Sequence, residues 1–363
     1  MNSLFVAPKN ILFLAFLFFS LQLAEARDTS AISSANTQGG TVFSSFYNED
    51  CLNLTIESNF QQLIDNKNTD TYQKAKVSYK SNSGELVQRD IKIKPRGKSR
   101  RRACDIPPFF MKFSKKDLLA DGLMADHKLK VVTHCLESDA VEGEQNILKE
   151  FLTYKMLNEL TDKSFRVQLV RISYLDTETK ETSERFGFVI ESSKELSRRL
   201  NSSRLKDVAI ETKDLEQTQY NTVAMFQYMI SNTDWQIPFF RNVKIYQPNE
   251  GGAATVVPYD FDFAGLVDAE YAVVNPDFAK EQEDIRDRIF LGHFESEAAM
   301  QEILDLFKQK KEAILSCCKD FTHLSDKNKK DVINYLEGFY KSIEKKRIVK
   351  RDFLNKEKIN PYY

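Results

Sequence analysis

Two aspartates separated by a single residue lie in an aromatic setting in the segment PYDFDFAG (258–265). An unpaired carboxylate is costly to bury, so two of them among aromatic side chains indicate either a charged partner or a chemical role. Asp234 and Asn242 lie shortly before them in SNTDWQIPFFRN (231–242). Carboxylate and amide oxygens of this kind suit Mg²⁺ or Mn²⁺. Histidine is missing from the cluster, which argues against Zn²⁺.

The elements around these residues predict a hairpin whose open end collects them. RNVKIYQ (241–247) and ATVVPYD (254–260) have the composition of strands and are joined by PNEGG. Residues at equal distances from the turn of a hairpin face each other, so Asn242 should lie beside the end of the second strand. Asp234 follows an apolar helical segment and should lie just before the open end of the hairpin.

Side chains alternate along a strand, which predicts that Asp260 and Asp262 share one face while the neighbouring aromatic residues take the other. A simpler alternative stays open. Asp234 could cap a helix end, and the two later aspartates could pair with arginines.

The rest of the chain divides into a strand-rich half and a helix-rich half. Alternating or apolar runs predict strands at 52–58, 74–80, 89–95, 107–114, 127–135, 164–176 and 185–192. An apolar stripe at helical spacing predicts one inserted helix over 147–160. The first half is therefore expected to be an antiparallel sheet with one helix, and the chain after Pro276 almost entirely helical. This division suggests two lobes with a ligand cleft at their junction.

The composition is that of a globular protein with a core, because 42% of the 363 residues are hydrophobic and 29% are charged. The formal net charge is −1, so no overall field attracts nucleic acid or a membrane. The basic run KPRGKSRRR is equally compatible with a solvated loop and with a loop that contacts phosphate. We predict no nucleic-acid partner.

The N-terminus predicts the compartment. Lys9 precedes the apolar run 11–23, and Ala24-Glu-Ala26 follows it, as in a secretory signal peptide of residues 1–26. We therefore expect a secreted or periplasmic protein with a flexible leader over 27–41 and no membrane span after cleavage. An uncleaved anchor is the alternative.

The chain has five cysteines, too few for a disulfide scaffold in this length. Export permits a bridge, and we expect it between Cys104 and Cys135, near predicted strand ends. Cys317 and Cys318 lie in a helical pattern and read as buried thiols.

Together these segments resemble the CotH-type (spore-coat protein H-like) atypical kinases, a secreted or coat-associated family with a protein-kinase-like fold. The order of an aspartate, an asparagine and an aspartate on a following strand is the layout that kinases use for phosphoryl transfer. The resemblance spans roughly residues 85–275. It rests on PRGKSRRRACDIPPFFMKF (95–113), LKVVTHC (129–135), NILKEFLTYKMLNELT (146–161), RFGFVIES (185–192) and the NTDW, RNVKIY and PYDFDFAG stretches.

The resemblance implies an α+β, two-lobed protein-kinase-like fold. The strand-rich, nucleotide-binding N-lobe with one inserted helix would cover 42–192, and the helix-rich C-lobe 193–345 with the catalytic and metal loops. A charged tail would follow over 346–363.

By the same resemblance, Asp234 is the catalytic aspartate, and Asn242 and Asp260 are metal ligands, with Asp262 as a further partner. The wide spacing between Asp234 and Asn242, with IPFF inserted, requires a bulge in that loop.

Glu150 matches the glutamate that pairs with a nucleotide-binding lysine, for which Lys112 is the first candidate and Lys130 the second. The chain has no G-x-G-x-x-G motif. Arginine forks match phosphate geometry, so the basic run could take over that role. The arginines concerned are Arg96, Arg100, Arg101 and Arg102.

The expected reaction is transfer of the γ-phosphoryl group of ATP to a hydroxyl of a protein or other extracellular acceptor, with Mg²⁺ or Mn²⁺. Two alternatives stay open. One is a glycan hydrolase that uses Asp234 and Asp260 as an acid–base pair. The other is a non-catalytic surface or coat binding protein that retains the fold.

Overall fold

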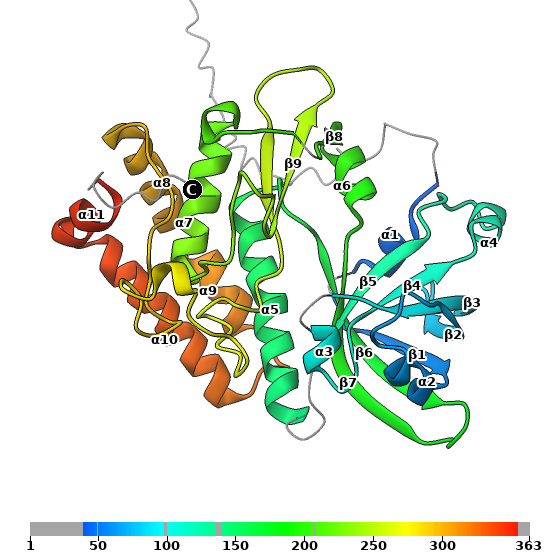
Figure 1. Cartoon of the computed structure of the whole chain (residues 1–363). Coiled ribbons are helices and arrows are strands. Elements are labelled where there is room, and N and C mark those ends of the chain that lie inside the picture. The colour runs from blue at the N-terminus through cyan, green and yellow to red at the C-terminus, as the bar shows by residue number, and fades with distance from the viewer. Residues whose placement is uncertain (1–38, 49, 98–99, 135–139, 207, 355–363) are drawn as a thin grey trace, which may run out of the picture. The chain divides into compact units, whose positions relative to one another are not determined.

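The computed structural model describes residues 39–48, 50–97, 100–134, 140–206 and 208–354, which belong to a single compact unit (Figure 1). The predicted signal peptide lies outside the described residues, as do nearly all of the predicted leader, Cys135, and the last residues of the predicted tail.

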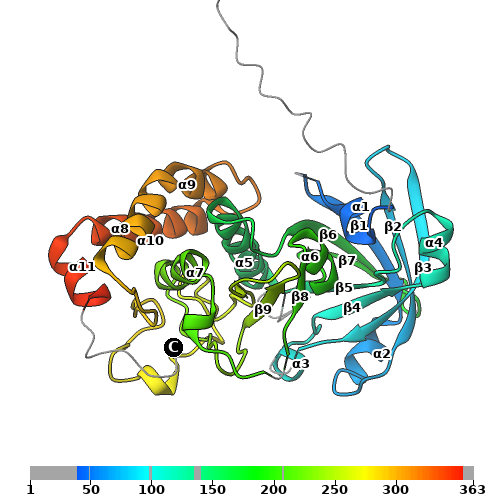
Figure 2. The same ribbon diagram turned by 90° about the horizontal axis from the view of Figure 1, so that it is seen from above.

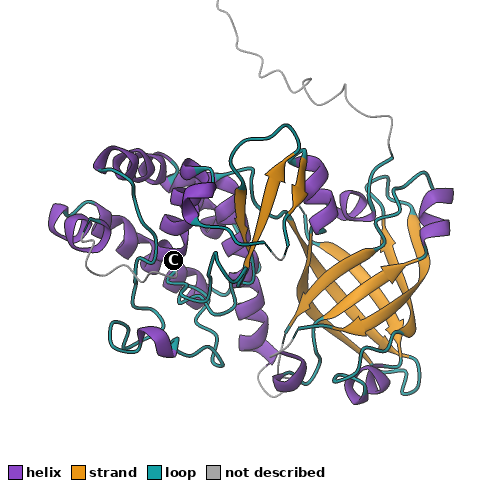
Figure 3. Cartoon of the chain, turned by 45° about the horizontal axis from the view of Figure 1, so that its top comes forward, coloured by secondary structure: helices purple, strands orange, loops and turns teal. Residues whose placement is uncertain are grey.

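Within the described residues, seven strands close into a barrel (Figure 3). They are β1 (Leu52–Ser58), β2 (Gln73–Lys80), β3 (Leu86–Pro95), β4 (Phe109–Phe113), β5 (Lys128–Thr133), β6 (Val167–Asp176) and β7 (Thr182–Ile190). Their order around the barrel is β1-β2-β3-β4-β5-β7-β6. Neighbours are antiparallel except for β1 and β6, whose parallel pairing closes the barrel.

The predicted fold class, a two-lobed protein-kinase-like α+β fold, is wrong. A closed barrel of mixed strands is not typical of that fold, and the expected wholly antiparallel sheet fails at the parallel β1–β6 pair. The predicted strand segments are themselves confirmed, with ends that differ by a few residues. Alternation along a strand reports which side faces a core, but it carries no information about whether the first and sixth strands meet.

Alternating side chains fill the barrel. In β2, Ala75, Val77 and Tyr79 are buried, while the residues between them point outward. The short helix α1 (Val42–Phe46) adds two aromatic rings to this core, and the Phe46 ring lies edge-on to that of Tyr79 at 4.6 Å. Three further short helices join barrel strands. They are α2 (Phe60–Asp65), α3 (Arg100–Ala103) and α4 (Lys115–Ala120).

The predicted inserted helix is α5 (Ala140–Leu160), which joins β5 to β6. Its buried residues run almost continuously from Asn146 to Leu157, so it is covered on most of its circumference. It contacts barrel strands and α9, and the view from above shows it between the barrel and the C-terminal helices (Figure 2).

A small sheet and further helices follow β7. Their bounds are α6 (Ser193–Arg199), β8 (Ser202–Arg204), α7 (Gln217–Met229), β9 (Val243–Pro248), β10 (Thr255–Pro258), α8 (Glu297–Gln309), α9 (Lys311–Lys319), α10 (Asp326–Ile343) and α11 (Lys346–Phe353). Single 3₁₀ turns lie at Thr212–Asp214 and Pro276–Phe278. The predicted hairpin is confirmed as β9–β10, and β8 pairs with β9 as an additional strand.

The predicted charged tail begins as α11, whose last residue is buried. The Phe353 ring lies 5.0 Å from those of Tyr228 and Phe290. Among the described helices, none has the length and apolar character needed to cross a membrane. Cys104 is disulfide-bonded, and its predicted partner lies outside the described residues, whereas Cys317 and Cys318 are free thiols.

Candidate functional site

The loop between α7 and β9 brings Asp234 and Asn242 together. The backbone N–H groups of Gln236 and Arg241 each donate to the other's carbonyl at 3.0 Å, which closes the loop around the inserted IPFF segment. The Asn242 amide then donates to the Asp234 carboxylate and to its backbone carbonyl, at 2.7 Å each. Asn242 has a φ of 49°, a left-handed conformation that asparagine tolerates. The chain accommodates the wide spacing by this closed loop.

The hairpin carries this pair to the end of β10. Val243 is in register with Pro258, and the backbone N–H of Tyr259 donates to the carbonyl of Asn242 at 2.9 Å. The pairing therefore continues one step past the strands and sets Asn242 beside the segment that follows β10, as the hairpin geometry predicted.

Three carboxylates meet just beyond that point. Glu150 of α5, Asp260 and Asp262 each offer an oxygen within 4.8 Å of the others. β10 ends at Pro258, so the two aspartates lie in a turn, and Asp260 has a φ of 67°. The backbone N–H of Asp260 donates to the hydroxyl of Tyr154 at 2.8 Å. Tyr154 lies one helical turn after Glu150, so α5 both supplies a carboxylate and holds the turn.

Phe261 anchors the turn against α5 and α7. Its side chain is fully buried, with its ring centre 4.7 Å from that of Tyr154 and 5.7 Å from that of Phe226 on α7. The aspartates thus face one way and the intervening aromatic residue the other. A turn produces this arrangement, rather than the strand that the sequence predicted.

The guanidinium of Arg100 lies among the carboxylates. Its Nε donates to Asp262 at 3.0 Å, and its Nη2 donates to Glu150 and to the Tyr271 hydroxyl at 2.9 Å each. The alternative expectation that Asp262 pairs with an arginine is confirmed. Arg100 begins α3, and its carbonyl accepts from the N–H of the disulfide-bonded Cys104.

The balance of charge in this cluster favours a further cation. Burial raises the pKa of Glu150 and of Asp262, and the charge of Asp260 adds to the effect while Arg100 opposes it. Oε1 of Glu150 is buried and has no hydrogen-bond partner among the described residues. Carboxylates that are difficult to ionise, with one oxygen unsatisfied, are the groups that a hard divalent ion would stabilise.

Asp234 has the properties of a proton acceptor. Burial raises its pKa to about 6, and the charges of Asp260 and Asp262 add to the rise while Arg241 opposes it. Its side chain is nevertheless 36% exposed, so a reactant can reach it. A base is most effective when its pKa lies near the working pH, which these surroundings achieve for an aspartate.

A cluster of cationic side chains lies next to the acids. Lys244 of β9 is only 4% exposed, and its ammonium lies 4.5 Å and 4.6 Å from the ring centres of Phe165 and Tyr259. It also donates to Ser193 at 2.7 Å. The ammonium of Lys130 on β5 lies 5.3 Å from the same Tyr259 ring.

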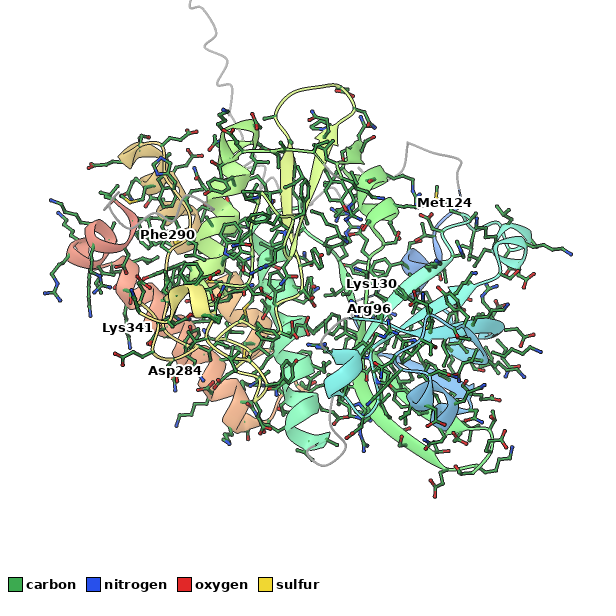
Figure 4. The ribbon with its side chains drawn as sticks, in the orientation of Figure 1. Arg96, Met124, Lys130, Asp284, Phe290 and Lys341 are labelled. Atoms are coloured by element: carbon green, nitrogen blue, oxygen red, sulfur yellow. The ribbon has the colours of Figure 1, made fainter. Side chains whose placement is uncertain are left out.

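Arg96 and Arg204 complete this cationic cluster. Burial, followed by repulsion from neighbouring cations, lowers the pKa of Lys244 to about 5 and that of Lys130 to about 8. The charge of Asp260 instead raises the pKa of Lys130, so Lys130 is the member of the cationic cluster that lies near the carboxylates. Arg96 and Lys130 are labelled beside each other in Figure 4. A multiply charged anion would relieve this repulsion.

The remaining predicted residues lie in three places. Arg96 and Lys130 belong to the cationic cluster, and Arg100 to the carboxylates. Lys112 lies on the outer face of the barrel with its ammonium 4.9 Å from the Tyr72 ring centre. Glu150 is paired with Arg100, so the predicted Lys112–Glu150 pair is not formed. Residues alternate along β4, and its inward positions are filled by apolar side chains, which turns Lys112 outward.

Three contributing residues were not predicted from the sequence. Lys244 is a single lysine within the apolar strand segment VKIY, which is a detectable signal because such strands rarely bury a charge. Tyr154 lies four residues after Glu150, a spacing that places both on one helical face. No local pattern distinguishes Arg204, which reaches the cluster only through the pairing of β8 with β9.

A scan of the sequence against models of protein families finds no match. The curated proteins likewise include none that is significantly similar. The resemblance to the CotH-type family therefore stays a prediction.

Proposed function

We propose that this protein transfers the γ-phosphoryl group of ATP to a hydroxyl of a protein or other extracellular acceptor. The observation that carries the proposal is the position of Asp260 between two groups of side chains: it is one of the three clustered carboxylates, and its charge also acts on Lys130, one of the four basic residues of the neighbouring cluster. A nucleotide triphosphate with a divalent ion has the complementary distribution, with a metal at one end of a chain of phosphate oxygens.

Glu150, Asp260 and Asp262 would hold the divalent ion, Mg²⁺ or Mn²⁺. All three are oxygen donors, and the buried Oε1 of Glu150 has no partner among the described residues. A bound metal of this kind supplies charge neutralisation for phosphate oxygens. Arg100 contacts two of the three carboxylates, so it would have to give up part of its hydrogen bonding when the ion binds.

The cationic cluster would hold the phosphates. The ammonium groups of Lys130 and Lys244 lie against the Tyr259 ring. Arg96 and Arg204 are close enough to lower the pKa of both lysines. This role replaces a glycine-rich phosphate loop with side-chain cations.

Asp234 would accept the proton of the attacking hydroxyl. The acceptor oxygen forms a bond to the γ-phosphorus, the bond from that phosphorus to the β–γ bridging oxygen breaks, and ADP leaves. Asn242 fixes the carboxylate of Asp234 through its amide. Positioning and charge neutralisation are the main contributions that proteins make to this reaction class.

The test combines binding with transfer. Titration calorimetry of the folded protein with Mg-ATP and Mn-ATP should show binding, and labelled ATP incubated with proteins of the same compartment should label an acceptor. Asp260→Ala should abolish transfer while the protein stays folded. Glu302→Gln, an exposed acid on α8, is the matched control and should leave transfer unchanged. Transfer that survives in Asp260→Ala would show that Asp260 is not a metal ligand.

A non-catalytic binding protein is the second candidate, and the Arg100 contacts favour it. An internal guanidinium that already bridges Glu150 and Asp262 can serve as a permanent counterion. In that case the folded protein would bind neither Mg-ATP nor Mn²⁺, which separates the two candidates.

A further inference from the structure

Four lysines form a continuous row across neighbouring barrel strands. The strand register pairs Lys74 with Lys92, Lys92 with Lys112, and Lys112 with Lys128. The residues that flank them along the strands point into the barrel core, so the four side chains lie on its outer face. Three are exposed, and Lys112 is half-buried.

This row is unfavourable for the folded protein by itself. Like charges directly opposite each other on a sheet are destabilising, and here three such pairs follow one another. Among the described residues, none of the four lysines forms an ion pair with a carboxylate. An arrangement that lowers stability without an internal partner indicates that the partner is an external anion.

The Tyr72 ring lies beside two lysines of the row, Lys112 and Lys128, and beside Lys94. Its ring centre lies 4.9 Å from the ammonium of Lys112, 5.1 Å from that of Lys94 and 5.8 Å from that of Lys128. Because cations occupy this ring, it is a poor platform for stacking a nucleic-acid base, which sites for single-stranded nucleic acid normally provide.

The surface beside the row is hollow. A cavity of about 710 Å³ is lined by three of the four row lysines, by the α4 residue Lys115, and by Ser114 and His127. Asp90 and Asp117 also line it, so cations exceed acids by four to two in this lining. A concave site suits a chain that lies in it better than a flat membrane surface, and the hydroxyl and the imidazole can hydrogen-bond to sugar hydroxyls.

We propose that this outer face of β2 to β5 binds an acidic glycan, a polysaccharide chain that carries sulfate or carboxylate groups. Neighbouring strands are about 4.8 Å apart, so the row presents one cation per strand over about 14 Å. A linear polyanion meets such a row with several charges at once. The proposal is independent of the phosphoryl-transfer site and requires neither nucleotide nor metal.

The test uses the full chain and a sulfated, heparin-type octasaccharide in titration calorimetry at several salt concentrations. The triple variant Lys74→Gln/Lys92→Gln/Lys128→Gln should bind at least about tenfold more weakly and show a smaller salt dependence. The control Lys327→Gln/Lys330→Gln/Lys341→Gln removes the same charge from exposed positions of α10 (Lys341 is labelled in Figure 4) and should bind like the wild type.

Further measurements complete the test. The desulfated octasaccharide, which keeps only its carboxylates, should bind more weakly than the sulfated one. The row variant should unfold at the same temperature as the wild type or higher, because its lysines no longer repel one another. Equal loss of binding in both triple variants would overturn the proposal in favour of a general charge effect. Binding of a thymidine oligonucleotide or of anionic lipid vesicles as tight as that of the octasaccharide would also overturn it.

Discussion

Arg100 is the residue on which the two candidate functions differ most. Its guanidinium satisfies one oxygen each of Glu150 and Asp262 but leaves Oε1 of Glu150 unpaired. The sequence predicted a phosphate contact for Arg100, since it lies in a basic run. The fold instead brings it to Asp262, more than a hundred positions further along the chain, and to Glu150 on α5. No spacing pattern in the sequence predicts these two contacts.

Replacing Arg100 by Met separates a structural role of the carboxylates from a metal site. Removal of one partner from a buried ion pair leaves uncompensated charge, so we expect the free energy of unfolding to fall by about 3–5 kcal/mol without divalent ions. If the carboxylates bind metal, Mn²⁺ should restore stability more in Arg100→Met than in the wild type. Denaturant unfolding with and without Mn²⁺ measures both effects.

Arg101→Met is the matched control for that experiment. Its guanidinium donates to the backbone carbonyls of Lys67 and Thr69 and pairs with Asp70 at 3.5 Å, so it holds a loop and not the three clustered carboxylates. The control variant should show no extra stabilisation by Mn²⁺. A loss in Arg100→Met that Mn²⁺ does not recover would identify Arg100 as a permanent counterion.

Asp234 predicts the pH dependence of transfer. Its pKa of about 6 means that the carboxylate is ionised and able to accept a proton above pH 6, and progressively protonated below it. The value of kcat/KM should therefore be level above pH 6 and fall about tenfold per pH unit well below it. Asp234→Asn should lower kcat by about 10²–10⁴ at pH 7. A profile that keeps its shape in the variant would assign the titration to another group.

The lowered pKa of Lys244 predicts that the protein takes up a proton when an anion binds. With a pKa of about 5, its amine is largely unprotonated at pH 7, and a bound phosphate raises that pKa and draws a proton from the buffer. Calorimetry in buffers of different ionisation enthalpy should give an uptake approaching one proton for ATP, and a smaller uptake for Lys244→Met. Tight ATP binding without any proton uptake would contradict the assigned place of the phosphates.

At the scale of elements, the site depends on α5 more than on any strand. This helix contributes Glu150 directly and holds Asp260 through the Tyr154 hydroxyl. The sequence identified α5 by its apolar stripe and the hairpin by its turn, because both patterns are local. It did not show that β10 ends before the aspartates, since PYDFD continues the alternation of a strand while Asp260 leaves it through a φ of 67°.

Tyr154→Phe tests this dependence. The variant leaves the partly buried N–H of Asp260 without its acceptor, which should lower the free energy of unfolding by about 1 kcal/mol. It should also weaken Mn²⁺ binding, because the turn that carries two carboxylates is no longer fixed. Tyr340→Phe is the control, since that hydroxyl has no hydrogen-bond partner among the described residues. Equal effects of the two substitutions would exclude a special role for Tyr154.

At the scale of the whole molecule, sequence reasoning found the pieces and misjudged their assembly. Seven strand segments and the hairpin follow from periodicity, and Asp234 and Asn242 meet as the hairpin required. Barrel closure does not follow, because the pairing of Leu52 with Val170 depends on the whole intervening chain. The resemblance that suggested a kinase-like fold rests on short segments, which do not determine how distant strands pair.

The closing β1–β6 pair also sets an order in which the chain can fold. Strands β1 to β5 pair with their neighbours in sequence. The second edge of β1 pairs only with β6, which follows α5 in the chain. Closing so long a loop is entropically costly and slow. During synthesis from the N-terminus, β1 and β5 would both be unpaired edges until β6 and β7 emerged, and such edges invite intermolecular pairing. A chain cut after α5 should therefore aggregate rather than form a smaller barrel.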